Sequence, residues 1–239
     1  MGELNSDVYI RDPHMLWQNG IIPYEFNNKV IDNLRQYVEI AMKEISKVSS
    51  IRFVKRTDQL HFIEIVDKGD YWSSVGKQGG KQELSVTTGW QNPVGSAIHE
   101  LLHSCGMFHE HSRPVKDKYV VVRRNGDCNY KKLKSSNVKS YFKYDFESIM
   151  HYPLTLCMDV KPGVKKPNSK IGQRVKLSKG DIKAINKLYP SWSCLPTQDN
   201  QRGRSGKTNT LKCQKKVFTV RCRKEIKRKK RIISIKDYY

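Results

Sequence analysis

The sequence predicts an α+β fold. Three observations lead to this prediction: a long amphipathic helix comes first, a group of short strands follows it, and two further helices lie later in the chain. Hydrophobic residues make up 37% of the 239 residues, so the chain can build a packed core, and disorder of the whole chain is not expected. The length suits one domain of roughly 200 residues with a short appendage.

The first helix is predicted over residues 29–49. Its apolar side chains recur at helical spacing and can line one buried face. These side chains are Val30, Leu34, Tyr37, Val38, Ala41, Ile45 and Val48.

Four strands are predicted after this helix, because short segments rich in Ile, Val and Phe alternate with turn residues. The Gly79-Gly80 pair marks the turn between the last two. The predicted strands lie at residues 51–54, 61–66, 71–76 and 83–88.

Two later helices have recognisable starts. Asn92 is predicted to cap a helix that has Pro93 at its first position and runs to about residue 105. Ser178 is predicted to cap a last helix over residues 178–189, which Pro190 would end.

The charge of the chain is uneven. The whole sequence carries a formal net charge of +22, and residues 195–239 hold 15 Lys plus Arg against 3 Asp plus Glu. Such a segment can bind a polyanion, such as nucleic acid, a heparin-like polymer or anionic lipid, or it can be a solvated tail. No run of 18 apolar residues is present, so a transmembrane segment is not predicted. Residues 1–10 lack the pattern of a secretory signal, so such a signal is expected to be absent or to have lain upstream.

The six cysteines form no C-x-x-C pair, so the sequence does not indicate a zinc ribbon or a thioredoxin-like site. Their even number is compatible with disulfide bonds, but six cysteines allow 15 pairings. They are Cys105, Cys128, Cys157, Cys194, Cys213 and Cys222.

A histidine-rich segment in the second helix predicts a metal site. His99 and His103 are four residues apart, so both rings project from one helix face and can reach one cation. Glu100 points about 100° away around the helix and can sit beside a metal-bound water. A lone H-E-x-x-H motif also arises by chance, and buried histidines are often only hydrogen-bonded.

Two further residues make chance a poor explanation. Gly106 lets the chain turn sharply after the helix, and His109 can then return to the same ion. Three protein ligands leave one position open for water, which is typical of catalytic zinc sites. The spacing H-E-x-x-H-x-x-G-x-x-H with a later methionine turn is the metzincin pattern.

The later methionine is Met150, whose thioether can pack beneath the histidines. Tyr152 follows two residues on, and its phenol can reach the metal and then hydrogen-bond an oxyanion. The alternative roles are ordinary core packing for Met150 and for Tyr152, one of 12 tyrosines.

These motifs resemble the astacin family of zinc metalloendopeptidases. Glu110 directly follows the third histidine, and the methionine turn reads Ser148-Ile149-Met150-His151-Tyr152. The resemblance covers roughly residues 12–194. Within this range, the segments that resemble the family outside the zinc motifs lie at residues 16–24, 51–54, 72–76, 171–174 and 177–189.

The resemblance implies a two-subdomain metzincin fold. A twisted N-terminal sheet with two long helices would face a mostly irregular C-terminal subdomain, with the zinc cleft between them. The catalytic domain would span residues 1–194, and residues 195–239 would form a basic tail that is a short hairpin or disordered.

The resemblance also implies the site. One Zn²⁺ per chain would be held by His99, His103, His109 and Tyr152 together with a water. Glu100 would act as general base and then general acid. Glu110 in this family pairs with the freed N-terminus of the mature enzyme.

The chain departs from the family at its disulfides. Both usual bridges are expected to be missing, and Cys105 is expected to be a small buried apolar residue. Replacement pairings of Cys128 with Cys157 and of Cys213 with Cys222 are predicted. Where the family has cysteines, this chain has Ser50, Tyr71, Trp90 and Cys194.

The implied function is a secreted, monomeric zinc-dependent endopeptidase that hydrolyses peptide bonds in proteins or peptides. The alternative is a catalytically silent zinc-binding protein whose basic tail holds a polyanion, and a weaker reading makes that tail a nucleic-acid binder. Substrate is expected to pair with an edge strand near residues 72–76. Acidic or small residues are expected just after the cut, because four lysines lie near the primed side: Lys161, Lys165, Lys166 and Lys170.

Overall fold

The computed structural model describes residues 9–123, 130–140, 143–155 and 157–190. The predicted basic tail at residues 195–239 lies outside the described residues, as does Cys128. No helix among the described residues has the length and apolarity that a bilayer crossing demands.

A five-stranded sheet forms the N-terminal half, and its strand order is β3-β2-β4-β6-β5. The first four strands are parallel, and β5 is an antiparallel edge strand beside β6. The strands are β2 (Ile21–Phe26), β3 (Arg52–Lys55), β4 (Phe62–Val66), β5 (Trp72–Ser73) and β6 (Lys81–Ser85). The four predicted strands are therefore present, but the third is shorter than residues 71–76.

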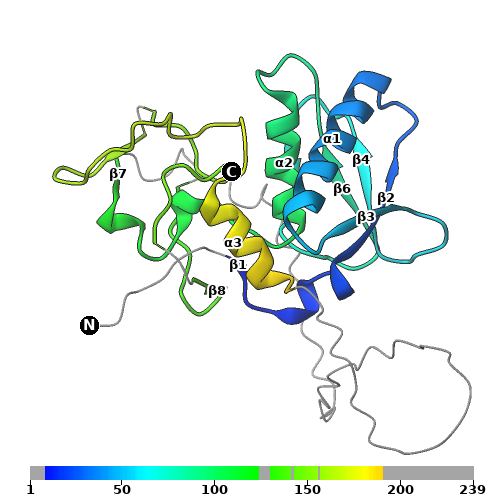
Figure 1. Ribbon diagram of the computed structural model, residues 1–239, viewed down its shortest axis with the longest axis horizontal. Helices are drawn as coiled ribbons and strands as arrows, with labels where there is room; N and C mark the ends of the chain where they lie inside the picture. The colour runs from blue at the N-terminus through cyan, green and yellow to red at the C-terminus, as the bar shows by residue number, and fades with distance from the viewer. Residues whose placement is uncertain (1–8, 124–129, 141–142, 156, 191–239) are drawn as a thin grey trace, which may run out of the picture. The chain divides into compact units, whose positions relative to one another are not determined.

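Two long helices pack against each other beside this sheet, as Figure 1 shows. Helix α1 spans Asp32–Val48 and α2 spans Pro93–Ser104. Most of the predicted apolar face of α1 is buried, but Tyr37 and Val48 are only half-buried. The helix begins three residues later than expected, so Val30 precedes it. Its buried residues are Leu34, Val38, Ala41, Met42 and Ile45.

Asn92 occupies the N-cap position of α2, as predicted, but its side chain does not cap the helix. Asn92 adopts the left-handed conformation, with φ 56° and ψ 61°, and its side chain makes no capping hydrogen bond to the described helix. Its carbonyl accepts the first helical hydrogen bond, from the Ser96 amide at 3.0 Å, as the carbonyl of an N-cap residue does. Pro93 occupies the first helical position, as predicted.

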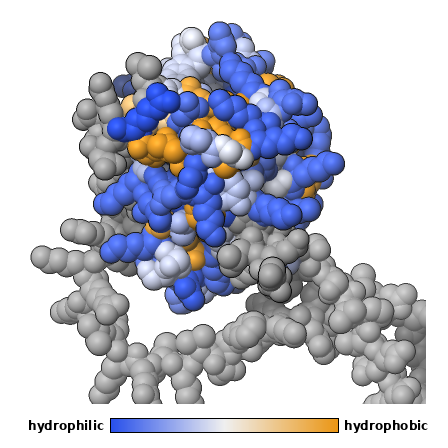
Figure 2. Space-filling model, turned by 90° about the vertical axis from the view of Figure 1, so that its left-hand side faces the viewer, coloured by the Kyte–Doolittle hydropathy of each residue, from blue (hydrophilic) through white to orange (hydrophobic). Residues whose placement is uncertain are grey.

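The described residues of the C-terminal half are mostly irregular, as predicted, and they include helix α3 and strands of two small antiparallel pairs. Strand β1 (Tyr9–Ile10) pairs with β8 (Val138–Lys139), and β7 (Val120–Val122) pairs with β9 (Met158–Val160). Figure 2 shows a mainly hydrophilic surface on the side of the molecule that lies at the left in Figure 1. Single 3₁₀ turns lie at Pro13–Met15, Gln18–Gly20, Glu110–Ser112 and Lys116–Lys118.

Helix α3 (Lys179–Leu188) has the predicted cap. Ser178 Oγ accepts from the Asp181 amide at 2.9 Å, and Asp181 Oδ2 accepts from the Ser178 amide at 2.8 Å, which completes a capping box. The end of α3 reaches the end of α1, because Asn186 Nδ2 donates to the Val48 carbonyl at 2.6 Å. One core cluster joins residues of α1, α2, α3 and the sheet with Ile149 and Met150.

The cysteines within the described residues have different roles. Cys105, at the C-cap of α2, is a free and fully buried thiol, as expected, and burial raises its pKa. Cys157 is disulfide-bonded. Because Cys128 lies outside the described residues, its pairing with Cys157 stays a prediction.

Candidate metal centre

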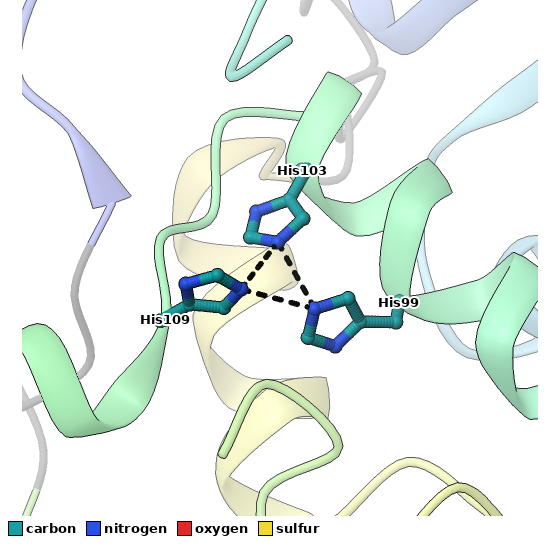
Figure 3. Close-up of side chains that lie close together, drawn as sticks. All are labelled: His99, His103 and His109. Carbon is teal, nitrogen blue, oxygen red and sulfur yellow. Dashed lines mark hydrogen bonds between the residues drawn. The ribbon is translucent and has the colours of Figure 1, made fainter. Parts of the chain in front are cut away.

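The three predicted histidines converge on one point (Figure 3). Their Nε2 atoms are separated by 3.1 Å for His99 and His103, 3.2 Å for His99 and His109, and 3.0 Å for His103 and His109. Helix α2 places the first two one turn apart. Gly106 then takes a positive φ of 102°, which few other residues adopt, and the chain turns back to present His109.

Hydrogen bonds on the far side of two rings fix their tautomers. His99 Nδ1 donates to the Ile149 carbonyl and His103 Nδ1 donates to the Met107 carbonyl, both at 2.8 Å. Burial lowers the pKa of His103 to about 3, and it also lowers the pKa of His99, so both rings are neutral. Each Nε2 therefore carries a lone pair and no hydrogen.

This arrangement fits a cation better than a hydrogen-bonded cluster. With both Nε2 atoms unprotonated, the 3.1 Å contact between His99 and His103 brings two lone pairs together and cannot be a hydrogen bond. A cation between the three nitrogens would turn this repulsion into ligation. Tetrahedral zinc with Zn–N bonds near 2.0–2.1 Å needs nitrogens about 3.3 Å apart, close to the observed separations. The predicted histidine ligands for one zinc ion are thus in place.

Glu100 lies beside the histidines with one carboxylate oxygen unsatisfied. The side chain is buried, and among the described residues its Oε2 has no hydrogen-bond partner. Burial raises the pKa of Glu100 to about 8, Arg174 opposes this rise, and Asp70 adds to it. A buried carboxyl oxygen without a partner needs a donor, and a water molecule in the adjoining cavity can supply one.

Tyr152 also lies at the centre. Its ring centroid is 4.3 Å from that of His109 and 4.3 Å from that of His111. The amide of Tyr152 donates to His111 Nδ1 at 3.3 Å. His111 is fully buried and was not among the predicted site residues, because a histidine two positions after a metal ligand has no distinctive spacing.

The methionine turn forms a floor for the site. Met150 is buried, and its carbonyl accepts from the Glu110 amide at 3.1 Å. The turn before it is held by Asp181 of α3, whose two oxygens accept from Ser148 Oγ at 2.6 Å and from the Ile149 amide at 2.9 Å. The backbone of Ile149 thus connects the two side chains: its amide donates to Asp181, and its carbonyl accepts from His99.

Glu110 has a buried partner within the described residues. Its Oε1 accepts from Arg113 Nη1 at 2.5 Å and from the Asp145 amide at 2.7 Å, and Glu110 and Arg113 are almost fully buried. The N-terminus expected to pair with Glu110 lies outside the described residues. Lys116, also buried, donates to the Tyr130 carbonyl.

A cavity of about 350 Å³ opens beside the histidines and is lined from both halves of the chain. His99, Glu100 and Tyr152, which were predicted as site residues, all line it. Arg174 lines it too, and Gly95 lets α2 approach this segment, since a Cβ there would lie 1.7 Å from the Arg174 carbonyl oxygen. The remaining lining residues are Asp70, Tyr71, Trp90, Ser96, Tyr130, Pro153 and Thr155.

A buried three-histidine centre next to an unsatisfied glutamate, set between a mixed sheet and an irregular half, defines a zinc metallopeptidase of the metzincin type. Comparison with known proteins agrees, because the family model described as Astacin, a peptidase family, matches residues 9–190. The chain belongs to the astacin family, as its motifs predicted.

Individual relatives are similar over most of this chain. The zinc metalloproteinase nas-4 of Caenorhabditis elegans is 37% identical over 194 residues, which cover 75% of this chain and 61% of the relative. High choriolytic enzyme 1 of Oryzias latipes is 34% identical over 179 residues, which cover 71% and 66%. The chain therefore spans somewhat less than two thirds of the length of either relative.

Solved structures confirm the fold. The hatching-enzyme zinc protease HCE-1 of Oryzias latipes superposes with a TM-score of 0.62 at 32% identity, covering 73% of this chain and 92% of that one. Myroilysin superposes with a TM-score of 0.56 at 19% identity, covering 77% and 98%, a likeness of fold alone.

Proposed function

We propose that the chain is the catalytic part of a secreted zinc-dependent endopeptidase that hydrolyses peptide bonds in proteins. The proposal rests on one observation: the buried Glu100, with an unpartnered Oε2, lines the same cavity as His99 of the histidine centre. A structural zinc site has no use for an unsatisfied carboxylate, whereas hydrolysis needs a base there. Secretion is proposed from the family.

The zinc, when bound, would polarise the scissile carbonyl and lower the pKa of water. Glu100 Oε2 accepts a proton from the attacking water, and the same carboxyl then passes it to the leaving amine. Tyr152, whose ring lies against His109, is proposed as a further zinc ligand whose phenol donates to the oxyanion.

Substrate recognition is proposed at two places. The edge strand β5 can pair with an extended peptide, because the edge of β5 facing away from β6 bears no strand among the described residues. Arg174 lines the cavity and favours an acidic residue just after the cut. None of the four lysines between 161 and 170 lines this cavity, so the acidic preference rests on Arg174 instead.

The organisation of the chain is proposed from sequence and family. We propose a catalytic domain over residues 1–194 and a basic tail over 195–239. The pairings of Cys128 with Cys157 and of Cys213 with Cys222 and a monomeric state are likewise proposals. The disulfide-bonded state of Cys157 supports the first pairing.

The alternative function is a silent zinc-binding protein that uses its tail to hold a polyanion. It predicts zinc binding without hydrolysis and gives Glu100 no role. The buried, unpartnered oxygen of Glu100 argues against it, since an idle carboxylate at that place would cost stability.

The test is hydrolysis of casein by the wild type and by Glu100→Ala, with the zinc content of both measured. We expect both proteins to bind one zinc and only the wild type to cleave casein, with a loss of at least about 10²-fold in the variant. Glu44→Ala, on the surface of α1, is the matched control and should keep full activity. Equal absence of activity in wild type and variant, with zinc bound, would favour the silent protein.

A further inference from the structure

One corner of the cavity is aromatic and acidic, whereas Arg174 brings a positive charge elsewhere in its lining. It is made by Asp70, Tyr71 and Trp90, all of which line the same cavity as Glu100. Tyr71 and Trp90 stand where the family has cysteines, so this chain has an aromatic pair in place of a bridge. These two rings pack with centroids 5.5 Å apart at 64°.

The aromatic pair is held in place yet open to a ligand. Tyr71 is buried, and its hydroxyl donates to the Thr87 carbonyl at 2.8 Å, so its ring is a fixed support. Trp90 rests against that ring at an angle and stays 55% exposed. A large apolar side chain that is this exposed, and that lines a cavity, offers a surface on which a planar group can stack.

A carboxylate lies next to the aromatic pair. Asp70 is exposed, and its Oδ1 accepts from the Tyr71 amide at 2.7 Å. Within the described part of the chain no ion pair includes Asp70.

We propose that Asp70 and Trp90 form a subsite for a basic side chain of the substrate, arginine above all. This inference rests on the proposed peptidase function and adds a specificity to it. A guanidinium is planar and charged, so it can stack on the indole of Trp90 and pair with Asp70 at the same time. An apolar side chain would cover Asp70 without giving it a partner, which is unfavourable.

The cavity then selects a substrate with opposite charges near the cut. Arg174 favours an acidic residue, and the Asp70–Trp90 corner favours a basic one. The corner is locally acidic in a chain of net charge +22, so the preference depends on short-range contacts and not on the overall field.

The test uses matched peptides that carry arginine, its neutral analogue citrulline, or leucine at each position near the cut. Values of kcat/KM are measured for the wild type, Asp70→Asn, Trp90→Ala and Trp90→Phe. At one position the wild type should prefer arginine over citrulline by about tenfold, the sum of an exposed ion pair and a cation–π contact. Asp70→Asn and Trp90→Ala should each reduce that ratio several-fold, and Trp90→Phe should keep most of it.

Both positions are exposed, so the variants should fold, which their thermal midpoints check. Binding of the arginine peptide to the zinc-loaded Glu100→Ala protein, measured by fluorescence anisotropy, gives a readout that does not need hydrolysis. A wild type that cleaves every peptide without an arginine preference, or an arginine preference that is undiminished in Asp70→Asn, would overturn the subsite alone. Tight binding without cleavage by the wild type would instead overturn the peptidase proposal and leave the subsite intact. A preference for leucine that depends on Trp90 would replace the basic occupant with an apolar one and overturn the inference.

Discussion

Asp181, in the first turn of α3, accepts a hydrogen bond at 2.6 Å from Ser148, at the start of the methionine turn. The other carboxylate oxygen accepts from Ile149, whose carbonyl holds the ring of His99. A single buried side chain therefore caps the last helix and positions a metal ligand. It acts through the backbone and does not touch the site itself, so its substitution should alter the centre indirectly.

Replacing Asp181 with alanine should leave three donors without their acceptor, one on each of Ser148, Ile149 and Ser178. We expect the free energy of unfolding to fall by about 2–4 kcal/mol and zinc to bind more weakly. Urea denaturation and zinc titration measure the two effects. Asp32→Ala, on the exposed first turn of α1, is the control and should change stability by less than about 1 kcal/mol. Unaltered zinc affinity in a destabilised Asp181→Ala protein would contradict the positioning role.

The titration of Asp181 should make stability depend on pH. Burial raises its pKa from 3.8 to about 6, although three hydrogen bonds oppose this. Between these values the folded protein binds the proton and the unfolded protein does not, so stability falls as the pH rises from about 4 to 6. Asp181→Asn should lose this component. The difference between wild type and variant, measured by denaturation at several pH values, should be steepest in this window, and a constant difference would refute the assignment.

Substitution of one histidine ligand should release the metal. His103→Ala is expected to lower zinc affinity by at least about 10²-fold, because two neutral imidazoles hold the ion less firmly than three. Zinc that binds only the folded state stabilises that state by about 2.7 kcal/mol when the free zinc concentration is 100 times Kd. A chelator should therefore lower the Tm of the wild type but not that of His103→Ala. His14→Ala, an exposed histidine in the same chain, should behave as the wild type. Equal zinc content in all three proteins would sink the three-histidine centre.

Tyr152→Phe should separate binding from chemistry. The ring that packs on His109 and His111 is retained, so stability and KM should change little. Loss of the phenol should reduce kcat by about 10²–10³-fold if it donates to the oxyanion. Steady-state kinetics on one peptide, with zinc content as control, provides the measurement. A variant with an unchanged kcat would assign Tyr152 to packing alone.

Gly95→Ala should destabilise the protein even though alanine is the better helix former. Alanine gains up to about 1 kcal/mol in helix propensity, but its Cβ would lie 1.7 Å from the Arg174 carbonyl oxygen. A backbone atom cannot swing aside, so α2 and the Arg174 segment must separate, at a cost of about 3 kcal/mol or more. Gly79→Ala, where nothing lies within 4 Å, should cost only the roughly 1–2 kcal/mol of its positive φ. Similar losses in both variants would contradict the close approach.

Periodic elements were predictable because local spacing determines them. The apolar face of α1 and the capping box at Ser178 followed from neighbouring residues alone. Asn92 holds the predicted N-cap position, but it adopts the left-handed conformation that asparagine tolerates and its side chain does not cap the helix, a detail that the spacing does not reveal. The two-residue strand β1 and its partner β8 had no local pattern, because their pairing joins segments almost 130 residues apart in sequence.

The same distinction applies to the site. The three histidines lie within 11 residues, and their offsets reveal a common target. Arg174 and Asp70 reach the cavity only through tertiary packing. A charged residue in a loop is usually solvated, so the sequence does not indicate that either of them lines a cavity. His111 was overlooked for a similar reason, because its burial between Tyr130 and Tyr152 depends on the fold of the C-terminal half.

The bonds between the end of α3 and the end of α1 also bear on how the chain is made. Asn186 reaches the Val48 carbonyl and Ser50 Oγ reaches the Tyr189 carbonyl, across 138 and 139 residues of sequence. During synthesis at about 5–20 residues per second, the N-terminal half emerges from the ribosome well before its last helix exists. For several seconds the end of the first helix therefore lacks its contacts with the last helix. A nascent chain stalled before residue 186 should remain accessible to proteases and to chaperones.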